Sequence, residues 1–247
     1  MATLVALAVL CAGAPVAGAA TVPASVNHWS GVQQFGMYGN ATLGDCSVAA
    51  VASLAQVWDV ESGGSGNALP LAPILNAYAA LGGNANRGVL PSQAFSAWES
   101  GIDGTKIAAV SSIASDETSV EQAISQLGGI YSVVNITPND PQHPGVPTSS
   151  ARAVAAWTLA TRPGPSVAEA HVVAVVGYDV NFVYLATWGA IQPVTWAWWN
   201  ARVVQSWAIL PESFVAQGHG PVSSVDALEH AYFTNADMAR QLGPYGS

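Results

Sequence analysis

The chain has 247 residues, of which 51% are hydrophobic and only 9% are charged. This length suits one domain or two small ones, and the composition excludes an intrinsically disordered chain, which needs low hydrophobicity and high charge. Lysine and arginine number 6 against 15 aspartate and glutamate, for a formal net charge of −9, which argues against binding to nucleic acid or to anionic lipid through basic residues.

Residues 1–20 form an apolar run without a charged side chain. Its small-residue end, Ala17-Gly18-Ala19, is typical of a signal-peptide cleavage site, whereas the missing basic start is not. A cleaved signal and a retained arm packed on this protein or a neighbour therefore stay equal alternatives. An internal glycine and proline argue against a membrane span. We divide the chain into an apolar arm or signal-like segment, 1–21, and a single domain, 22–247.

Helices are predicted in the first half of the domain. A helix beginning at Cys46 is indicated by apolar residues at helical spacing: Val48, Val51, Ala52, Ala55 and Trp58. Asp45 stands where an N-cap belongs, which places Cys46 in the first turn. A flexible loop at 62–67 follows, and further helices are expected over 70–81, 91–100, 117–127 and 222–241.

Strands dominate the later part of the chain. One is predicted at 129–136, and a loop at 138–150 with four prolines has the length of a site wall or lid. The β-branched runs 171–179 and 182–188 predict a hairpin of two largely buried strands. The Trp-rich stretch 195–210 is expected to cover the sheet. Because helices come before strands, the order predicts an α+β fold.

Cys46 and His171 are the residues that point to chemistry. A cysteine is a good nucleophile only as the thiolate, and a free thiol with a pKa of ~8.5 is mostly protonated at neutral pH. A helix N-terminus and a nearby imidazolium both lower that pKa. Cys46 has the first by its position, and His171 could supply the second from the start of a buried strand. Only one other cysteine, Cys11, is present, which excludes a disulfide-rich scaffold and a zinc site of several cysteines.

The segment HVVAVVGYDVNFVYLATWG at 171–189 resembles the histidine strand and hairpin of the papain superfamily, which read H-A-V…G-Y-G…N-S-W-G. That superfamily has a glutamine six residues before the cysteine of its central helix, and Asn40 stands six residues before Cys46. His171 lies 125 residues after Cys46, close to the ~130–150 residues typical of papain-type pairs. The segment MYGNATLGDC at 37–46 further resembles papain-like proteins of actinobacteria and their bacteriophages, with a G-N-x-x-x-G-D-C motif.

The resemblance implies a papain-like α+β domain, in which a helical half led by the nucleophile helix packs on an antiparallel β-rich half. It implies that Cys46 is the nucleophile and that His171 is the general base that later protonates the leaving group. Asn40 takes the place of the family's glutamine and shares an oxyanion hole with the Cys46 backbone N–H. Trp188 matches the tryptophan that shields the catalytic pair from water. Asp45, Thr187 and Trp188 are thus expected to support the site.

One position departs from the family's pattern. The asparagine that orients the imidazole falls on Ala186, or on Thr187 if the shorter hairpin is gapped there. Alanine cannot hold a ring, whereas a threonine hydroxyl or a backbone carbonyl can. A working Cys–His dyad and a site that has drifted toward a non-catalytic role both fit this departure, so whether the chain is an enzyme stays open.

The function expected is that of a thiol hydrolase, a cysteine peptidase or amidase, which cleaves a peptide or other amide through a Cys46 thioester without a cofactor. No metal is expected, because the other histidines lack ligand spacing: His28, His143, His219 and His230. The loops 59–70 and 138–150 are the expected cleft walls. The alternative is a weak or inactive papain-fold component that binds protein neighbours in an assembly such as a phage particle. A secreted hydrolase of cell-wall peptide is a third possibility, so a secreted and a virion-associated location both stay open.

Overall fold

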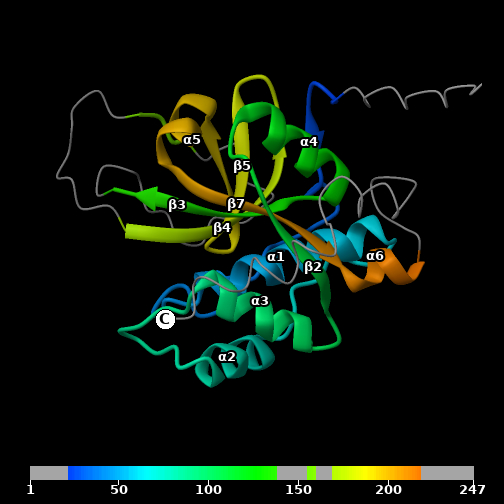
Figure 1. Ribbon diagram of the computed structural model, residues 1–247, viewed down its shortest axis with the longest axis vertical. Helices are drawn as coiled ribbons and strands as arrows, with labels where there is room; N and C mark the ends of the chain where they lie inside the picture. The colour runs from blue at the N-terminus through cyan, green and yellow to red at the C-terminus, as the bar shows by residue number, and fades with distance from the viewer. Residues whose placement is uncertain (1–21, 138–154, 160–168, 218–247) are drawn as a thin grey trace, which may run out of the picture.

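The computed structural model describes residues 22–137, 155–159 and 169–217 (Figure 1). The apolar segment 1–21, the predicted loop 138–150 and the predicted helix 222–241 lie outside these residues. The helices are α1 Cys46–Glu61, α2 Leu71–Ala80, α3 Pro91–Ser100, α4 Glu117–Leu127, α5 Trp196–Arg202 and α6 Glu212–Gln217. The strands are β1 Val26–Asn27, β2 Ile107–Ile113, β3 Ile130–Ile136, β4 Glu169–Tyr178, β5 Phe182–Thr187, β6 Ala190–Thr195 and β7 Val203–Pro211.

The described strands form one antiparallel sheet with the order β2-β7-β3-β4-β5-β6, and the short β1 pairs with the end of β4. Helices α1, α2 and α3 gather on one side of the molecule, whereas α4 and α5 lie with the sheet on the other (Figure 1). The predicted α+β fold, with a helical half packed on an antiparallel β-rich half, is therefore confirmed. Strand β2 precedes α4, so the helices and strands are less segregated along the chain than expected.

Helix α1 lies between the two halves and contacts β3, β4 and β5 as well as α2 and α3. Every residue from Ser47 to Trp58 is buried, which is possible because the helix is built of small and apolar side chains on all faces. Gln56 is the largest polar side chain among them, and its amide accepts from the Gly36 N–H at 3.0 Å and donates to the carbonyls of Gln34 and Gly66 at 3.0 Å each. Helix α1 is therefore fixed to the loops on either side of it.

The Trp-rich stretch 195–210 is the main correction to the predicted fold. It does not cover the sheet: α5 occupies its first part, and β7 then runs between β2 and β3 within the sheet. The predicted covering role fits only α5, whose three tryptophans, Trp196, Trp198 and Trp199, are buried in the core. Strand β7 alternates at its start and is buried from Ser206 to Pro211, because both of its edges are paired.

A two-residue turn joins β5 to β6 and places part of the candidate site. Thr187 pairs with Ala190, so Trp188 and Gly189 form the turn, with φ values of 49° and 74°. Positive φ at both central positions is the signature of a type I′ turn, whose twist matches that of the flanking strands. The turn is tight enough that a Cβ atom at Gly189 would lie 3.3 Å from the Met37 Cβ. The strand ends therefore hold Trp188 in a conformation that bulky residues rarely adopt.

Candidate active site

Cys46 is the first residue of α1 and is partly buried against strand β4. Burial raises the pKa of its thiol, a hydrogen bond with the Val172 backbone N–H lowers it, and the negative charge of Asp45 raises it again. Val172 directly follows His171 in β4. The structure thus brings the start of α1 to the strand position of the histidine, as the sequence predicts.

His171 lies near the start of β4 and is 8% exposed. Its Nε2 atom is 2.6 Å from the Thr187 Oγ1 atom on the neighbouring strand. Burial lowers the pKa of the imidazole from 6.5 to about 4, so the ring is neutral at neutral pH. A neutral imidazole with one nitrogen engaged has its other nitrogen as the remaining donor or acceptor.

Strand register explains why Thr187, and not Ala186, meets the histidine. Ala186 pairs with Ala174, and continuing this pairing by one residue places Thr187 opposite Val173. Alternate residues of a strand share a face, so Thr187 lies on the same face of the sheet as His171. Of the two positions that the sequence left open for the orienting residue, Thr187 is the one that contacts the ring.

Trp188 stacks on the imidazole, with ring centroids 4.6 Å apart and planes 18° apart. The turn at the end of β5 thus holds the indole against a residue of the neighbouring strand β4. Behind it stands Trp157, whose ring centroid lies 5.9 Å from that of Trp188 and 5.2 Å from that of Trp198. Together these rings bury one face of His171, which is consistent with the expected shielding by Trp188.

Trp157 was not singled out from the sequence. It is buried and forms an isolated parallel bridge with Val194, where its N–H donates to the Pro193 carbonyl at 2.9 Å and its carbonyl accepts from the Thr195 N–H at 3.0 Å. The signal available was a lone tryptophan between two polar or proline-rich stretches. Such a residue is typical of a point where a long connection docks on the core.

Asn40 lies in a compact turn that precedes α1. The Gly39 carbonyl accepts from the Thr42 N–H at 2.9 Å and from the Leu43 N–H at 2.8 Å. The Asn40 amide donates to the Met37 carbonyl at 3.3 Å. Because an amide NH₂ carries two hydrogens, this bond leaves a second one for a ligand.

Asp45 occupies the predicted N-cap position, but its side chain does not cap the helix. Its backbone has φ −86° and ψ 10°, away from the extended conformation in which a cap side chain reaches the first turn. The Oδ2 atom accepts instead from the Gly39 N–H at 2.8 Å, and the carboxyl group is completely buried. Burial raises its pKa from 3.8 to about 6.

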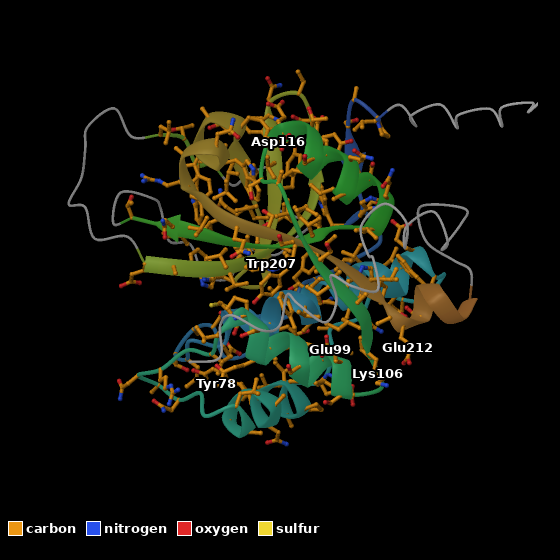
Figure 2. The ribbon with its side chains drawn as sticks, viewed as in Figure 1. Tyr78, Glu99, Lys106, Asp116, Trp207 and Glu212 are labelled. Carbon is orange, nitrogen blue, oxygen red and sulfur yellow. The ribbon has the colours of Figure 1, made fainter. Side chains whose placement is uncertain are left out.

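Tyr131 is a further residue near Cys46 that sequence reasoning missed. It is completely buried on β3, and its ring packs edge-on against Phe95 and Trp207 at centroid distances of 4.8 and 5.6 Å. Figure 2 shows Trp207 at the boundary between the sheet and the helical half. Burial and the nearby Cys46 both raise the pKa of the Tyr131 phenol, whose oxygen has no hydrogen-bond partner among the described residues.

Within the described ranges, no group of three or more His, Cys, Asp or Glu side chains could hold a metal ion. His28 pairs with Glu61 at 2.7 Å, while His143, His219 and His230 lie outside the described residues. A search of that same part of the chain finds no helix with the length and hydropathy needed to cross a bilayer.

No protein-family model and no curated protein matches the sequence. Solved structures do match. Digestive procathepsin L 3 of the Tenebrio molitor larval midgut gives a TM-score of 0.54 at 15% identity, over 79% of this chain and 72% of its own. Xylellain, a cysteine protease from Xylella fastidiosa, gives 0.55 at 12% identity, over 77% and 87%. A cysteine protease of Carica candamarcensis gives 0.50 at 18% identity, over 76% and 99%. The chain therefore has the papain-like fold.

Proposed function

We propose that this protein is a thiol hydrolase that cleaves a peptide or another amide through a thioester at Cys46. The observation that carries the proposal is the 2.6 Å contact between His171 Nε2 and Thr187 Oγ1. It supplies an orienting partner for the imidazole in place of the family's asparagine. His171 directly precedes Val172, the strand residue whose backbone N–H forms a hydrogen bond with the Cys46 thiol.

In the proposed reaction, the Nε2–H of His171 donates to Thr187, so that Nδ1 carries the lone pair and acts as the base. Nδ1 takes the thiol proton as sulfur attacks the substrate carbonyl, and the oxyanion accepts from the Cys46 backbone N–H and the Asn40 amide. The imidazolium then gives its proton to the leaving nitrogen, the C–N bond breaks and a thioester remains. A water, deprotonated by His171, attacks the thioester and releases the acid and the Cys46 thiol.

The burial of both groups determines when the proton moves. Burial raises the pKa of the Cys46 thiol and lowers the pKa of His171 to about 4, so both groups are neutral at rest. The proton therefore passes to His171 during attack, as in general-base catalysis, and no ion pair is formed beforehand. Trp188 stacked on the ring excludes water from one face of the imidazole during this transfer.

The test follows the modification of Cys46 by a limiting dose of iodoacetamide at near-neutral pH, with the modified peptide quantified by mass. We expect His171→Ala to slow this modification by about 10²-fold, the lower end for general-base assistance. His28→Ala is the matched control, because that histidine pairs with Glu61 away from the thiol. Equal rates for His171→Ala and the folded wild type would contradict the proposal.

A second candidate function is a papain-fold binding or structural component of a larger assembly. The burial of Cys46 and His171 supports this candidate. Buried side chains that stay neutral can serve to pack the fold without taking part in a reaction. The alkylation experiment separates the two candidates. A slow Cys46 that is indifferent to His171, in protein shown to be folded by circular dichroism, supports the assembly component.

A further inference from the structure

The turn that carries Asn40 is joined to the start of α1 by one buried side-chain contact. Within the turn, backbone hydrogen bonds close the chain on itself at the Gly39 carbonyl. The Gly39 N–H points the other way and donates to the Asp45 Oδ2 atom at 2.8 Å. Asp45 immediately precedes Cys46, so this bond connects the position beside Asn40 to the position beside the nucleophile.

The packing around this bond is close. A Cβ atom at Gly39 would lie 2.9 Å from Asp45 Oδ2, 2.9 Å from Leu43 Cδ1 and 3.0 Å from Leu75 Cδ2. Real Cβ atoms essentially never lie this close to another heavy atom, so a side chain at this position would displace the end of the Asp45 or Leu43 side chain. The turn is thus docked on Asp45, and its distance from α1 is set by that contact.

Burying a carboxyl group costs free energy, and that of Asp45 does not cap the helix that it precedes. Asp45 is completely buried, its Oδ1 atom has no partner among the described residues, and its side chain contributes nothing to capping α1. Burying an unneutralised carboxylate is unfavourable unless it is hydrogen-bonded. The single bond that it does make holds the turn of Asn40.

The titratable groups that face Asp45 are Cys46, Tyr38 and Tyr78 (Figure 2 labels Tyr78). Tyr38 belongs to the segment before the turn and has φ 49°, and its buried hydroxyl has no partner among the described residues. Tyr78 on α2 donates to the carbonyls of Asn84 and Arg87 at 2.8 and 2.6 Å. The negative charge of Asp45 raises the pKa of Cys46, so the carboxylate hinders formation of the thiolate while it holds the turn.

We infer that Asp45 is a positioning residue for acyl transfer, which holds the Asn40 turn at the oxyanion position through the Gly39 N–H. This inference rests on the proposed function. It predicts that Asp45 matters for one kind of reaction at Cys46 and not for another. Attack on a carbonyl develops an oxyanion and needs the turn in place, whereas alkylation by iodoacetamide is a substitution at a saturated carbon and needs no oxyanion donor.

The experiment compares Asp45→Leu with Asp45→Asn. Leucine has nearly the shape of aspartate but accepts no hydrogen bond, whereas the asparagine carbonyl can still accept from the Gly39 N–H. Acylation is followed as the burst of p-nitrophenolate from p-nitrophenyl acetate, with Cys46→Ala as the blank. Alkylation of Cys46 by iodoacetamide is measured on the same samples and also reports that the site is folded.

Loss of one oxyanion donor typically lowers the rate about 10²–10³-fold. Asp45→Leu displaces the Asn40 donor rather than removing it, so we expect acylation to slow by at least about tenfold. Alkylation of the same variant is equal to or faster than that of wild type, because a negative charge beside the thiol is removed. Asp45→Asn restores most of the acylation rate. Gly39→Ala, which forces the turn off Asp45, reproduces the Asp45→Leu split between the two reactions.

Asn40→Ala completes the test. If Asp45 acts through Asn40, adding Asn40→Ala to Asp45→Leu slows acylation by much less than Asn40→Ala does alone. Full acylation in Asp45→Leu would overturn the inference. So would equal losses of acylation and alkylation in both Asp45 variants, which mark a merely structural role. A wild-type Cys46 whose acylation and alkylation are both unchanged by His171→Ala overturns the proposed function itself, and the inference with it.

Discussion

The two sides of the candidate site are held in place by different means. On the sheet side, His171, Thr187 and Trp188 occupy adjacent strands and the turn that ends one of them, so backbone pairing determines their spacing. On the helix side, Asn40 sits in a loop that side-chain hydrogen bonds tie to α1, through Gln56 near Gly36 and through Asp45 at Gly39, next to Asn40.

This difference has a physical consequence. A sheet register is specified by many hydrogen bonds at once, so no single side chain decides where His171 lies. A turn whose position beside a helix is set by one side-chain hydrogen bond can shift locally when that bond is lost, even where the rest of its loop stays attached. The side that carries His171 is therefore the robust half of the candidate site, and the Asn40 turn is the half open to adjustment.

The largest expected effect is on the pH dependence of the free energy of unfolding, to which the two sides of the site contribute with opposite sign. Burial raises the pKa of Asp45 from 3.8 to about 6 and lowers the pKa of His171 from 6.5 to about 4. Between pH 3.8 and about 6, the folded protein binds more protons at Asp45 than the unfolded chain does. The contribution of Asp45 to the free energy of unfolding therefore falls as pH rises. At His171 the folded protein binds fewer, so that contribution rises with pH. Each amounts to about 3 kcal/mol, with opposite sign.

Single variants separate these two opposite pH dependences of the free energy of unfolding. Relative to wild type, the free energy of unfolding of Asp45→Asn gains about 2 kcal/mol as pH rises from 4 to 7, because the cost of ionising Asp45 is absent. That of His171→Gln loses about 3 kcal/mol over the same range. Urea unfolding followed by tryptophan fluorescence measures both. Differences from wild type that do not change with pH would show that neither group is perturbed by folding.

Thr187→Val tests the sheet side. Valine keeps the shape of threonine and removes the hydroxyl that contacts His171 at 2.6 Å. A hydrogen bond to a group that becomes charged contributes about 1.5–3 kcal/mol, so we expect acylation by p-nitrophenyl acetate to slow by about 10- to 100-fold. Thr187→Ser, which keeps the hydroxyl, is the matched control and should retain most of the rate. A valine variant as fast as wild type would leave the imidazole without an orienting side chain.

Tyr131→Phe gives the smallest effect and tests the boundary between the two sides. The phenol oxygen is buried and unpartnered among the described residues, so its removal should raise the free energy of unfolding by about 1 kcal/mol. The aromatic contacts with Phe95 and Trp207 are retained. A destabilised variant in urea unfolding would reveal a hydrogen bond at this oxygen, and so a polar role beside Cys46.

The elements that could be predicted from sequence are those with local signals. Helix α4 spans the predicted residues because Asp116 caps it by accepting from the Ser119 N–H at 3.1 Å, and Gly128 ends it with φ 77°. Helix α3 begins at Pro91, which is favourable in a first turn. Strands β2 and β7 were missed because their partners are distant in sequence, and β6, which directly follows its partner β5, was missed because its own signal is weak. Strand β6 contains Pro193.

The same distinction applies to the site. Cys46 and His171 could be chosen from their motifs, and the structure places their segments together. The choice between Ala186 and Thr187 could not be made, because a shift of one residue in register moves a side chain to the other face of a sheet. The partner of Asp45 could not be predicted either, because the side chain reaches back to Gly39 rather than forward into its own helix.

The turn at Trp188 and Gly189 bears on how this protein would respond to laboratory evolution. A tryptophan at φ 49° is strained, and asparagine or glycine would fit that backbone more easily. A library selected only for heat resistance is therefore expected to replace Trp188 and to uncover the imidazole. A library selected for turnover would keep it. Whether that tryptophan survives each regime would show, without any knowledge of the substrate, which property this chain has been shaped to preserve.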